Sequence, residues 1–183
     1  LAELAESAGI PAGVINIVTG MDGPAIGKTL CDDDRIRKMT FTGSTEVGRI
    51  LMRQSAGTLK KMSLELGGNA PLIVFDDADI DTAIAGTMAS KYRNAGQTCV
   101  CANRIFVQDG IYDEFARRLT EATAAMKVGN GMEDGVEQGP IIDGQGLNKI
   151  ERHVADARAK GAEVLTGGGL SLIHISEPTR QLC

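Results

Sequence analysis

The sequence is poor in the residues that mark metal sites and disulfide frameworks. It has two histidines and four cysteines among 183 residues. The histidines are His153 and His174, and the cysteines are Cys31, Cys99, Cys101 and Cys183. Their spacing matches no zinc-binding pattern, and four cysteines are too few for a disulfide scaffold. We therefore expect reduced thiols and no bound metal.

Long runs of basic or apolar residues are also missing. The formal net charge is -5 and the sequence pI is about 5.1, which argues against a nucleic-acid partner. No apolar stretch approaches the roughly 20 residues that a membrane-spanning helix needs, and the opening LAELAESAGIP has no signal-peptide pattern. We expect no membrane partner and a cytoplasmic location, or the mitochondrial matrix if the source is eukaryotic. The chain lacks an initiator Met, and we expect it to be an internal piece of a longer protein.

The residues that are present indicate an α/β architecture. Hydrophobic residues make up 43% and charged residues 23% of the chain, as in ordinary globular proteins. Helical and strand-like patterns alternate along the sequence. Strands are predicted at 14–18, 38–42, 62–66, 71–75, 105–107 and 163–165. Helices are predicted near 1–8, 24–31, 45–56, 79–95, 111–126 and 147–160, with Ser44 or Thr45 capping the third.

Cys99 is the first candidate for chemistry. It closes the segment 94–99, in which Gly96 breaks a helical pattern. A thiol in a glycine-containing turn can open onto a cleft, where backbone N–H groups stabilise a thiolate or an oxyanion. Free cysteine is among the most buried residue types, so for Cys99 taken alone a structural role is the better interpretation.

Glu65 is the second candidate. It lies between Leu64 and Leu66 at the end of an apolar strand, directly before two glycines. Side chains alternate along a strand, so the carboxylate is expected to point away from both leucines. A position facing a cleft would suit it to proton abstraction. Without further context, a solvent-facing glutamate on an edge strand is the more common arrangement.

The third element is the segment FTGSTEVG at 41–48, a strand followed by a glycine turn and a helix. Backbone N–H groups and a hydroxyl at a helix N-terminus form an anion site suited to pyrophosphate. The spacing differs from the G-x-G-x-x-G of the usual dinucleotide fold. A simple helix cap explains the segment equally well.

Taken together and in this order, the three elements resemble the aldehyde dehydrogenase family. FTGSTEVG resembles its cofactor-phosphate turn, LELGGNAP at 64–71 its general-base motif and GQTC at 96–99 its nucleophile motif. The resemblance runs from Leu1 to about Gly169. It implies a fragment of that α/β fold, with the C-terminal part of a Rossmann-like NAD(P)-binding domain at 1–67 and the N-terminal part of a catalytic domain at 68–169.

The resemblance implies NAD- or NADP-dependent aldehyde oxidation through a cysteine thioester. Cys99 would attack the aldehyde, and Glu65 would activate the water that hydrolyses the thioester. Ser44 would be the best single candidate for contact with the cofactor phosphate. The cofactor-binding residues implied by the resemblance are Thr42, Gly43, Ser44 and Leu66.

The segment 92–104 is similar to the succinate-semialdehyde dehydrogenase branch of the family. In that branch an arginine six positions before the nucleophile binds the distal carboxylate of the substrate, and here this position is Arg93. The implied substrate is succinate semialdehyde or glutarate semialdehyde. The alternatives are an Arg93 that pairs with a surface acid and another aldehyde as substrate, a catalytically silent relative, or an acylating enzyme, against which Glu65 argues.

Further expectations concern Cys101 and the ends of the chain. Cys101 forms a C-x-C pair with Cys99, which in some relatives closes a reversible disulfide; a small buried residue is the alternative. Because family members are several hundred residues long, we expect the fragment itself to be inactive and its parent to be a dimer or tetramer. The segment LSLIHISEPTR at 170–180 resembles translated sequencing adapter, so residues 170–183 are predicted to be non-native, the alternative being a genuine strand and proline turn.

Overall fold

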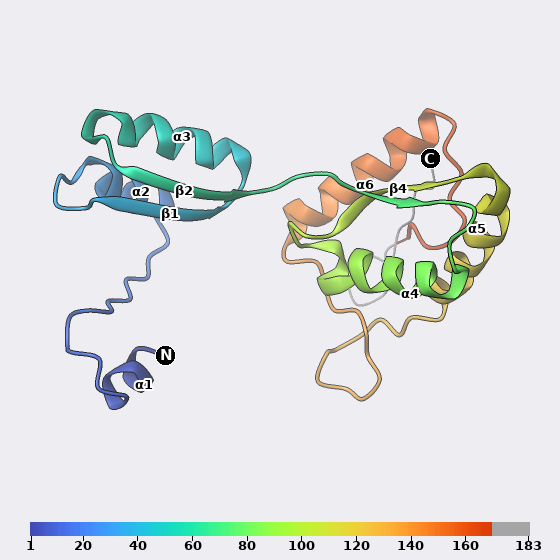
Figure 1. Ribbon diagram of the computed structural model, residues 1–183, viewed down its shortest axis with the longest axis horizontal. Helices are drawn as coiled ribbons and strands as arrows, with labels where there is room; N and C mark the ends of the chain where they lie inside the picture. Colours follow the sequence, from blue (N-terminus) through green and yellow to red (C-terminus); the bar gives the residue numbers. More distant parts are fainter. Residues whose placement is uncertain (170–183) are drawn as a thin grey trace. The chain divides into compact units, whose positions relative to one another are not determined.

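A computed structural model describes residues 1–169 of the chain (Figure 1). The chain divides into two compact units, the first ending at Gly67 and the second beginning at Gly68. We call them unit 1 and unit 2 and take each by itself. The boundary predicted from the sequence between the cofactor-binding and catalytic parts lies at the same residues. The functions assigned to the two parts stay predictions. The adapter interpretation of 170–183, with His174 and Cys183, lies outside the described residues.

Unit 1 contains a β-α-β arrangement. Its helices and strands are α1 (Ala2–Ser7), α2 (Gly23–Asp32), β1 (Lys38–Gly43), α3 (Thr45–Ser55), the short 3-10 helix η1 (Ala56–Thr58) and β2 (Lys61–Leu66). The two strands are parallel and in continuous register, from Lys38 opposite Lys61 to Gly43 opposite Leu66. Parallel neighbours need a crossover connection, which α3 supplies.

A small core holds α2 and α3 against the strands of unit 1. Cys31 of α2, Met39 of β1 and Leu51 of α3 form its buried centre, with Phe41 and Met62 packed around it. Cys31 is fully buried and its thiol lies 3.6 Å from the Met39 sulfur. Cys31 is therefore a packing residue.

One charged side chain of unit 1 is buried, and the fold satisfies it. Lys60 donates hydrogen bonds to the backbone carbonyls of Asp33, at 2.6 Å, and Ile36, at 3.0 Å. Partners of this kind offset the cost of removing an ammonium group from water. Lys60 thereby ties the start of β2 to the loop before β1.

The strand predicted at 14–18 is wrong. The segment has no regular structure, and Val14, Ile17 and Val18 are at least 66% exposed. A β-branched run becomes a strand only where a neighbouring strand supplies hydrogen bonds. No strand of residues 1–169 pairs with the segment 14–18.

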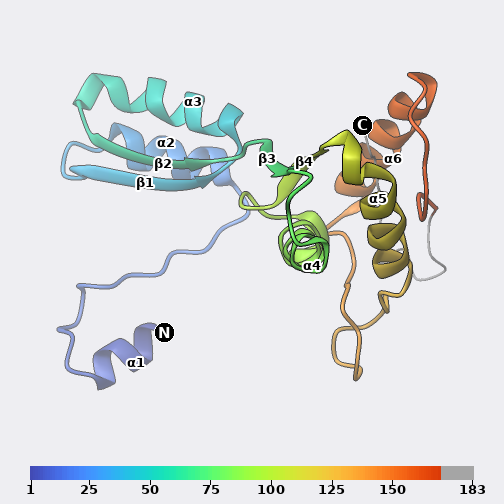
Figure 2. The ribbon, with the colours of Figure 1, turned by 45° about the vertical axis from the view of Figure 1, so that its right-hand side comes forward.

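Unit 2 consists of a second parallel strand pair with helices packed on it. Its elements are β3 (Ala70–Val74), α4 (Ile80–Lys91), the 3-10 turn η2 (Arg93–Gly96), β4 (Ala102–Val107), α5 (Asp109–Ala124) and α6 (Gly144–Ala159). Figure 2 shows β3 and β4 side by side above α4. Side-chain oxygens of Asp79 and Asp143 cap α4 and α6 by accepting from the backbone N–H groups of Thr82 and Gly146.

The core of unit 2 is larger, and the apolar residues that recur with a helical period along α5 lie in it. Phe115 and Leu119 are fully buried against Val74, with apolar residues of α4 and β4 around them. Thr123, one turn further along the same face, is 1% exposed. The strand predicted at 163–165 is wrong, since that segment has no regular structure and pairs with no strand of residues 1–169.

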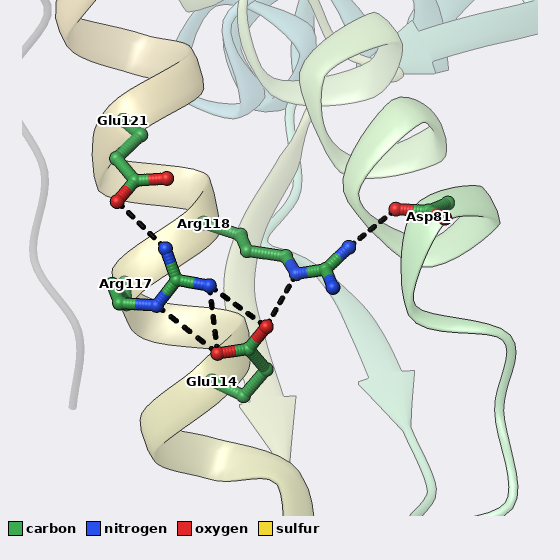
Figure 3. Close-up of polar contacts among 5 residues, drawn as sticks. All are labelled: Asp81, Glu114, Arg117, Arg118 and Glu121. Atoms are coloured by element: carbon green, nitrogen blue, oxygen red, sulfur yellow. Dashed lines mark hydrogen bonds and ion pairs between the residues drawn. The ribbon is translucent and has the colours of Figure 1, made fainter.

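An ion-pair network joins α4 to α5 on the surface of unit 2 (Figure 3). Arg118 of α5 contacts Asp81 in the first turn of α4 and Glu114 on its own helix. Arg117 contacts Glu114 at 2.8 Å and Glu121 at 2.7 Å. The two guanidinium groups, Arg118 more strongly, lower the pKa of Glu114. The network links two helices that share the core.

Candidate active site

In unit 1, the residues predicted for cofactor binding and for base catalysis meet at one end of the strand pair. Thr42 lies opposite Glu65 in the β1–β2 register, and Gly43 lies opposite Leu66. Ser44 follows directly and begins α3. Both strands are parallel, so these are their carboxyl ends, the edge at which α/β sheets bind ligands.

The N-terminus of α3 is capped by Ser44. The Ser44 hydroxyl accepts a hydrogen bond from the backbone N–H of Val47 at 3.2 Å. Ser44, Thr45 and Glu46 are all exposed. The remaining N–H groups of the first turn have no partner within the helix and suit a phosphate. The cap predicted from the sequence is confirmed, and the local geometry fits a phosphate of NAD or NADP.

Gly48 is a packing residue between α3 and β2. It is buried, and a Cβ atom at this position would lie 2.8 Å from a methyl group of Leu66. Its missing side chain therefore lets α3 lie close to the end of β2. The half-buried Leu66 side chain is used in this packing, which sets the position of the backbone next to Glu65.

Glu65 itself is exposed, between the half-buried Leu64 and Leu66. The alternation along β2 is the one expected from the sequence, and the carboxylate points away from both leucines. An exposed carboxylate at the ligand-binding edge is free to act on a water molecule. Its action as a base stays a prediction.

In unit 2, Cys99 lies in an unusual turn between η2 and β4. The thiol-bearing residue is exposed, whereas Cys101, two positions later, is completely buried. Asn94, Ala95 and Gly96 all have left-handed backbone conformations, with φ values of 51°, 54° and 76°. Successive left-handed residues other than glycine are rare and need support from their surroundings.

Hydrogen bonds supply that support, and they centre on Gln97. Its Nε2 donates to the backbone carbonyls of Asn94 at 3.2 Å and Pro140 at 3.4 Å. Its Oε1 accepts from the backbone N–H of Ile142 at 2.9 Å. The Asn94 side chain in turn donates to the carbonyl of Gln97 at 3.3 Å. The motif GQTC contains Gln97, but Pro140 and Ile142 lie too far along the chain for a motif to indicate them.

Cys101 is held beneath this turn. Its thiol donates to the carbonyl of Lys91 at 3.3 Å, and the Lys91 ammonium lies 3.9 Å from the sulfur. A Cβ atom on Gly96 would lie 3.8 Å from the same sulfur, so the turn covers the thiol. This placement favours the interpretation of Cys101 as a small buried residue, and Cys99 and Cys101 are both free thiols.

Arg93 opens the same turn and is exposed. Within residues 1–169 it forms no ion pair with a carboxylate, whereas Arg35, Arg117 and Arg118 do. The alternative in which Arg93 pairs with a surface acid is therefore not realised among these residues. The guanidinium is left available to an anionic ligand.

Residues 1–169 contain neither a helix that could span a membrane nor a metal-binding cluster. None of their helices is long and apolar enough to cross a membrane. Nor do they hold a group of three or more histidine, cysteine, aspartate or glutamate side chains placed to bind a metal ion.

Comparison with known proteins places these features in a family. The profile of the aldehyde dehydrogenase family matches residues 1–179. The chain therefore belongs to the aldehyde dehydrogenase family, and the predicted family and α/β fold class are confirmed. The match includes part of the segment interpreted as adapter-derived, so that interpretation stays a prediction.

Several similar proteins within the family are semialdehyde dehydrogenases. A glutarate-semialdehyde dehydrogenase of Pseudomonas putida is 58% identical over 179 residues, which cover 98% of this chain and 37% of that protein. The succinate-semialdehyde dehydrogenase GabD of Escherichia coli, whose name specifies NADP(+), is 59% identical over 168 residues, covering 92% and 35%. The crystal structure of an E. coli NADP-dependent enzyme is 56% identical with a TM-score of 0.94, covering 97% and 37%. The chain thus spans little more than a third of the length of these proteins.

Proposed function

We propose that the protein containing this chain oxidises a short aldehyde with a distal carboxylate, succinate or glutarate semialdehyde, to the diacid with NAD or NADP. The observation that carries the proposal is the exposed Cys99 in a hydrogen-bonded turn that begins at the exposed Arg93, which pairs with no carboxylate of residues 1–169. The named activities of the two similar semialdehyde dehydrogenases support the same substrate class.

The chemistry begins at the Cys99 sulfur. The thiolate attacks the aldehyde carbon and forms a carbon–sulfur bond, while the carbonyl electrons move to oxygen. In this proposal the backbone N–H of Cys99 would donate to that oxyanion. Sulfur suits the step because it adds readily and later leaves as a thiolate.

In this proposal, residues of unit 1 bind the cofactor. Thr42, Gly43 and Ser44 would hold a phosphate at the N-terminus of α3, where partial positive charge favours an anion. A bound nicotinamide would accept the hydride that leaves the substrate carbon, so that Cys99 is left carrying a thioester. Leu66 supports this site by packing on Gly48.

Glu65 completes the cycle in this proposal. It would take a proton from water as the water oxygen attacks the thioester carbon. The carbon–sulfur bond then breaks, the acid leaves and the Cys99 thiolate is regenerated. The pairing of Thr42 with Glu65 in the sheet supports a base that acts beside the cofactor.

The role of Arg93 is tested by a matched substrate panel. In the full-length protein, NAD(P)H formation is measured with succinate and glutarate semialdehydes and with butanal and pentanal, which lack the carboxylate. A charge-assisted bidentate contact predicts a KM for the semialdehydes that rises roughly 10- to 100-fold in Arg93→Ala. Arg158→Ala removes an exposed arginine from α6 and should change nothing. Equal preference for both aldehyde classes in the unaltered protein would refute the substrate assignment.

The remaining features belong to the proposal with tests of their own. A disulfide between Cys99 and Cys101 would require the Cys101 thiol to leave the Lys91 carbonyl and reach the surface. Mass spectrometry of oxidised protein without such a bond would exclude it. We also propose a homo-oligomeric parent in the cytoplasm, or in the mitochondrial matrix of a eukaryote, to be tested by light scattering and fractionation.

A further inference from the structure

The segment 138–142 contacts both ends of the turn that carries Cys99. It belongs to the long connection between α5 and α6, drawn in orange in Figure 1. At one end of the turn, the Gln138 Nε2 donates to the backbone carbonyl of Tyr92 at 2.6 Å. At the other end, Gln97 bonds the carbonyl of Pro140 and the N–H of Ile142. We call residues 138–142 the brace.

The chemistry of these contacts requires an amide at position 97. Two of the partners are backbone carbonyls, which only accept, and the third is a backbone N–H, which only donates. A glutamine side chain has a donor and an acceptor on one planar group. A glutamate offers no donor at neutral pH, and an asparagine is one carbon shorter. The three partners also fix which end of the Gln97 amide is nitrogen.

The brace is itself anchored to the segment that directly follows α5. The backbone N–H of Gln138 donates to the carbonyl of Lys127 at 3.2 Å, and its carbonyl accepts from the N–H of Gly129 at 2.9 Å. Gln138 is only 5% exposed, so the hydrogen bond from its side-chain amide to the Tyr92 carbonyl is shielded from water. The Tyr92 ring is buried as well, and its hydroxyl accepts from Thr123 of α5 at 3.1 Å.

We propose that Gln97 and Gln138 are positioning residues for the Cys99 nucleophile. They hold a left-handed turn that the backbone of Asn94 and Ala95 does not favour by itself, and so fix the direction of the Cys99 side chain and N–H. The inference rests on the proposed function only in taking Cys99 as the nucleophile. The brace and its bonds stand independently of that role.

The first test uses the 183-residue chain and its own cysteines. Cys101 lies beneath the turn and Cys31 in the core of unit 1, and both are 0% exposed. Each thiol is followed by iodoacetamide labelling and peptide mass spectrometry. In Gln97→Ala the labelling of Cys101 should accelerate roughly fivefold to thirtyfold as the turn opens, with Cys31 unchanged. The matched control Gln145→Ala, at an exposed position in the first turn of α6, should label like the unaltered chain.

Hydrogen exchange distinguishes the role of the Gln97 side-chain oxygen from that of its nitrogen. Gln97→Glu keeps the oxygen that accepts from the Ile142 N–H but loses the donor. The Ile142 N–H should therefore stay protected in Gln97→Glu and exchange faster in Gln97→Ala, while Cys101 labelling rises in both. Unchanged labelling and exchange in Gln97→Ala would overturn the proposal. Equal acceleration at Cys31 and Cys101 would also overturn it, because Gln97 would then be a general stabilising residue.

The second test measures turnover in the full-length protein. Gln97→Ala and Gln138→Leu should lower kcat at least roughly tenfold with KM changed less than threefold, the pattern of a misplaced nucleophile. An unchanged kcat would refute positioning even if labelling shows an opened turn. If Cys99→Ala retains activity, the proposed function fails, and the labelling experiment still decides whether the brace exists.

Discussion

Replacing Phe115 by alanine tests the packing that places the Cys99 turn. Phe115 is 0% exposed and contacts Val74 in the core shared by β3, β4 and α4. Removing a buried aromatic ring costs about 3–5 kcal/mol, a large part of the roughly 5–15 kcal/mol by which a domain is stable. With a urea dependence of about 1–3 kcal/mol per molar, the unfolding midpoint should fall by roughly 2 M.

Phe75→Ala is the matched control, since it removes the same atoms from a side chain that is 61% exposed. Its cost should stay below about 1 kcal/mol. The chain has no tryptophan, and its two tyrosines, Tyr92 and Tyr112, lie in unit 2. Tyrosine fluorescence in urea therefore reports the unfolding of unit 2. Equal midpoint shifts for the two phenylalanine variants would refute the assigned core.

Three further predictions concern caps, charges and the turn. Ser44→Ala removes the cap of α3 and should cost about 0.5–2 kcal/mol, seen as a lower melting temperature by circular dichroism; Thr45→Ala, which removes no cap bond, should not match that loss. The guanidinium groups of α5 lower the pKa of Glu114 from 4.5, so its stabilisation is present above that value and lost as pH falls through the lower, folded pKa. Glu114→Gln should flatten this acid decline in the urea midpoint, and an unchanged pH profile would contradict the ion-pair account. Gly96→Ala should destabilise unit 2, because φ is +76° and the new Cβ would lie 3.3 Å from a carbonyl, whereas Gly86→Ala within α4 should stabilise it by about 0.5–1 kcal/mol; the same sign for both would refute the left-handed turn.

Local patterns predicted the elements whose partners lie within this chain. The strands at 38–42 and 62–66 form because α3 brings them into parallel register. The apolar face of α5 could be read from its helical period, and Ser44 from its place before a helix. The segments 14–18 and 163–165 carry equally strand-like residues but remain irregular. The hydrophobic pattern of a segment indicates which side chains a strand there would bury. Whether the strand forms depends on a neighbouring strand that pairs with it.

In the candidate site, too, local sequence patterns do not reveal contacts between residues that are distant along the chain. Motifs made Cys99 and Glu65 candidates for chemistry because each stands in a short contiguous segment. The support of Cys99 could not be predicted, since Gln97 bonds residues 43 and 45 positions away and Gln138 one that is 46 positions away. Separations of this size depend on how α4 and α5 pack, which no local spacing encodes.

The central claim is that the Cys99 sulfur carries the substrate and that Glu65 releases it. Full-length Glu65→Gln protein, incubated with succinate semialdehyde and NAD(P) and analysed by peptide mass spectrometry, should accumulate one succinyl group on Cys99. The Cys99→Ala protein should carry none. A succinyl group on another residue, or full turnover by Glu65→Gln without any adduct, would contradict the account.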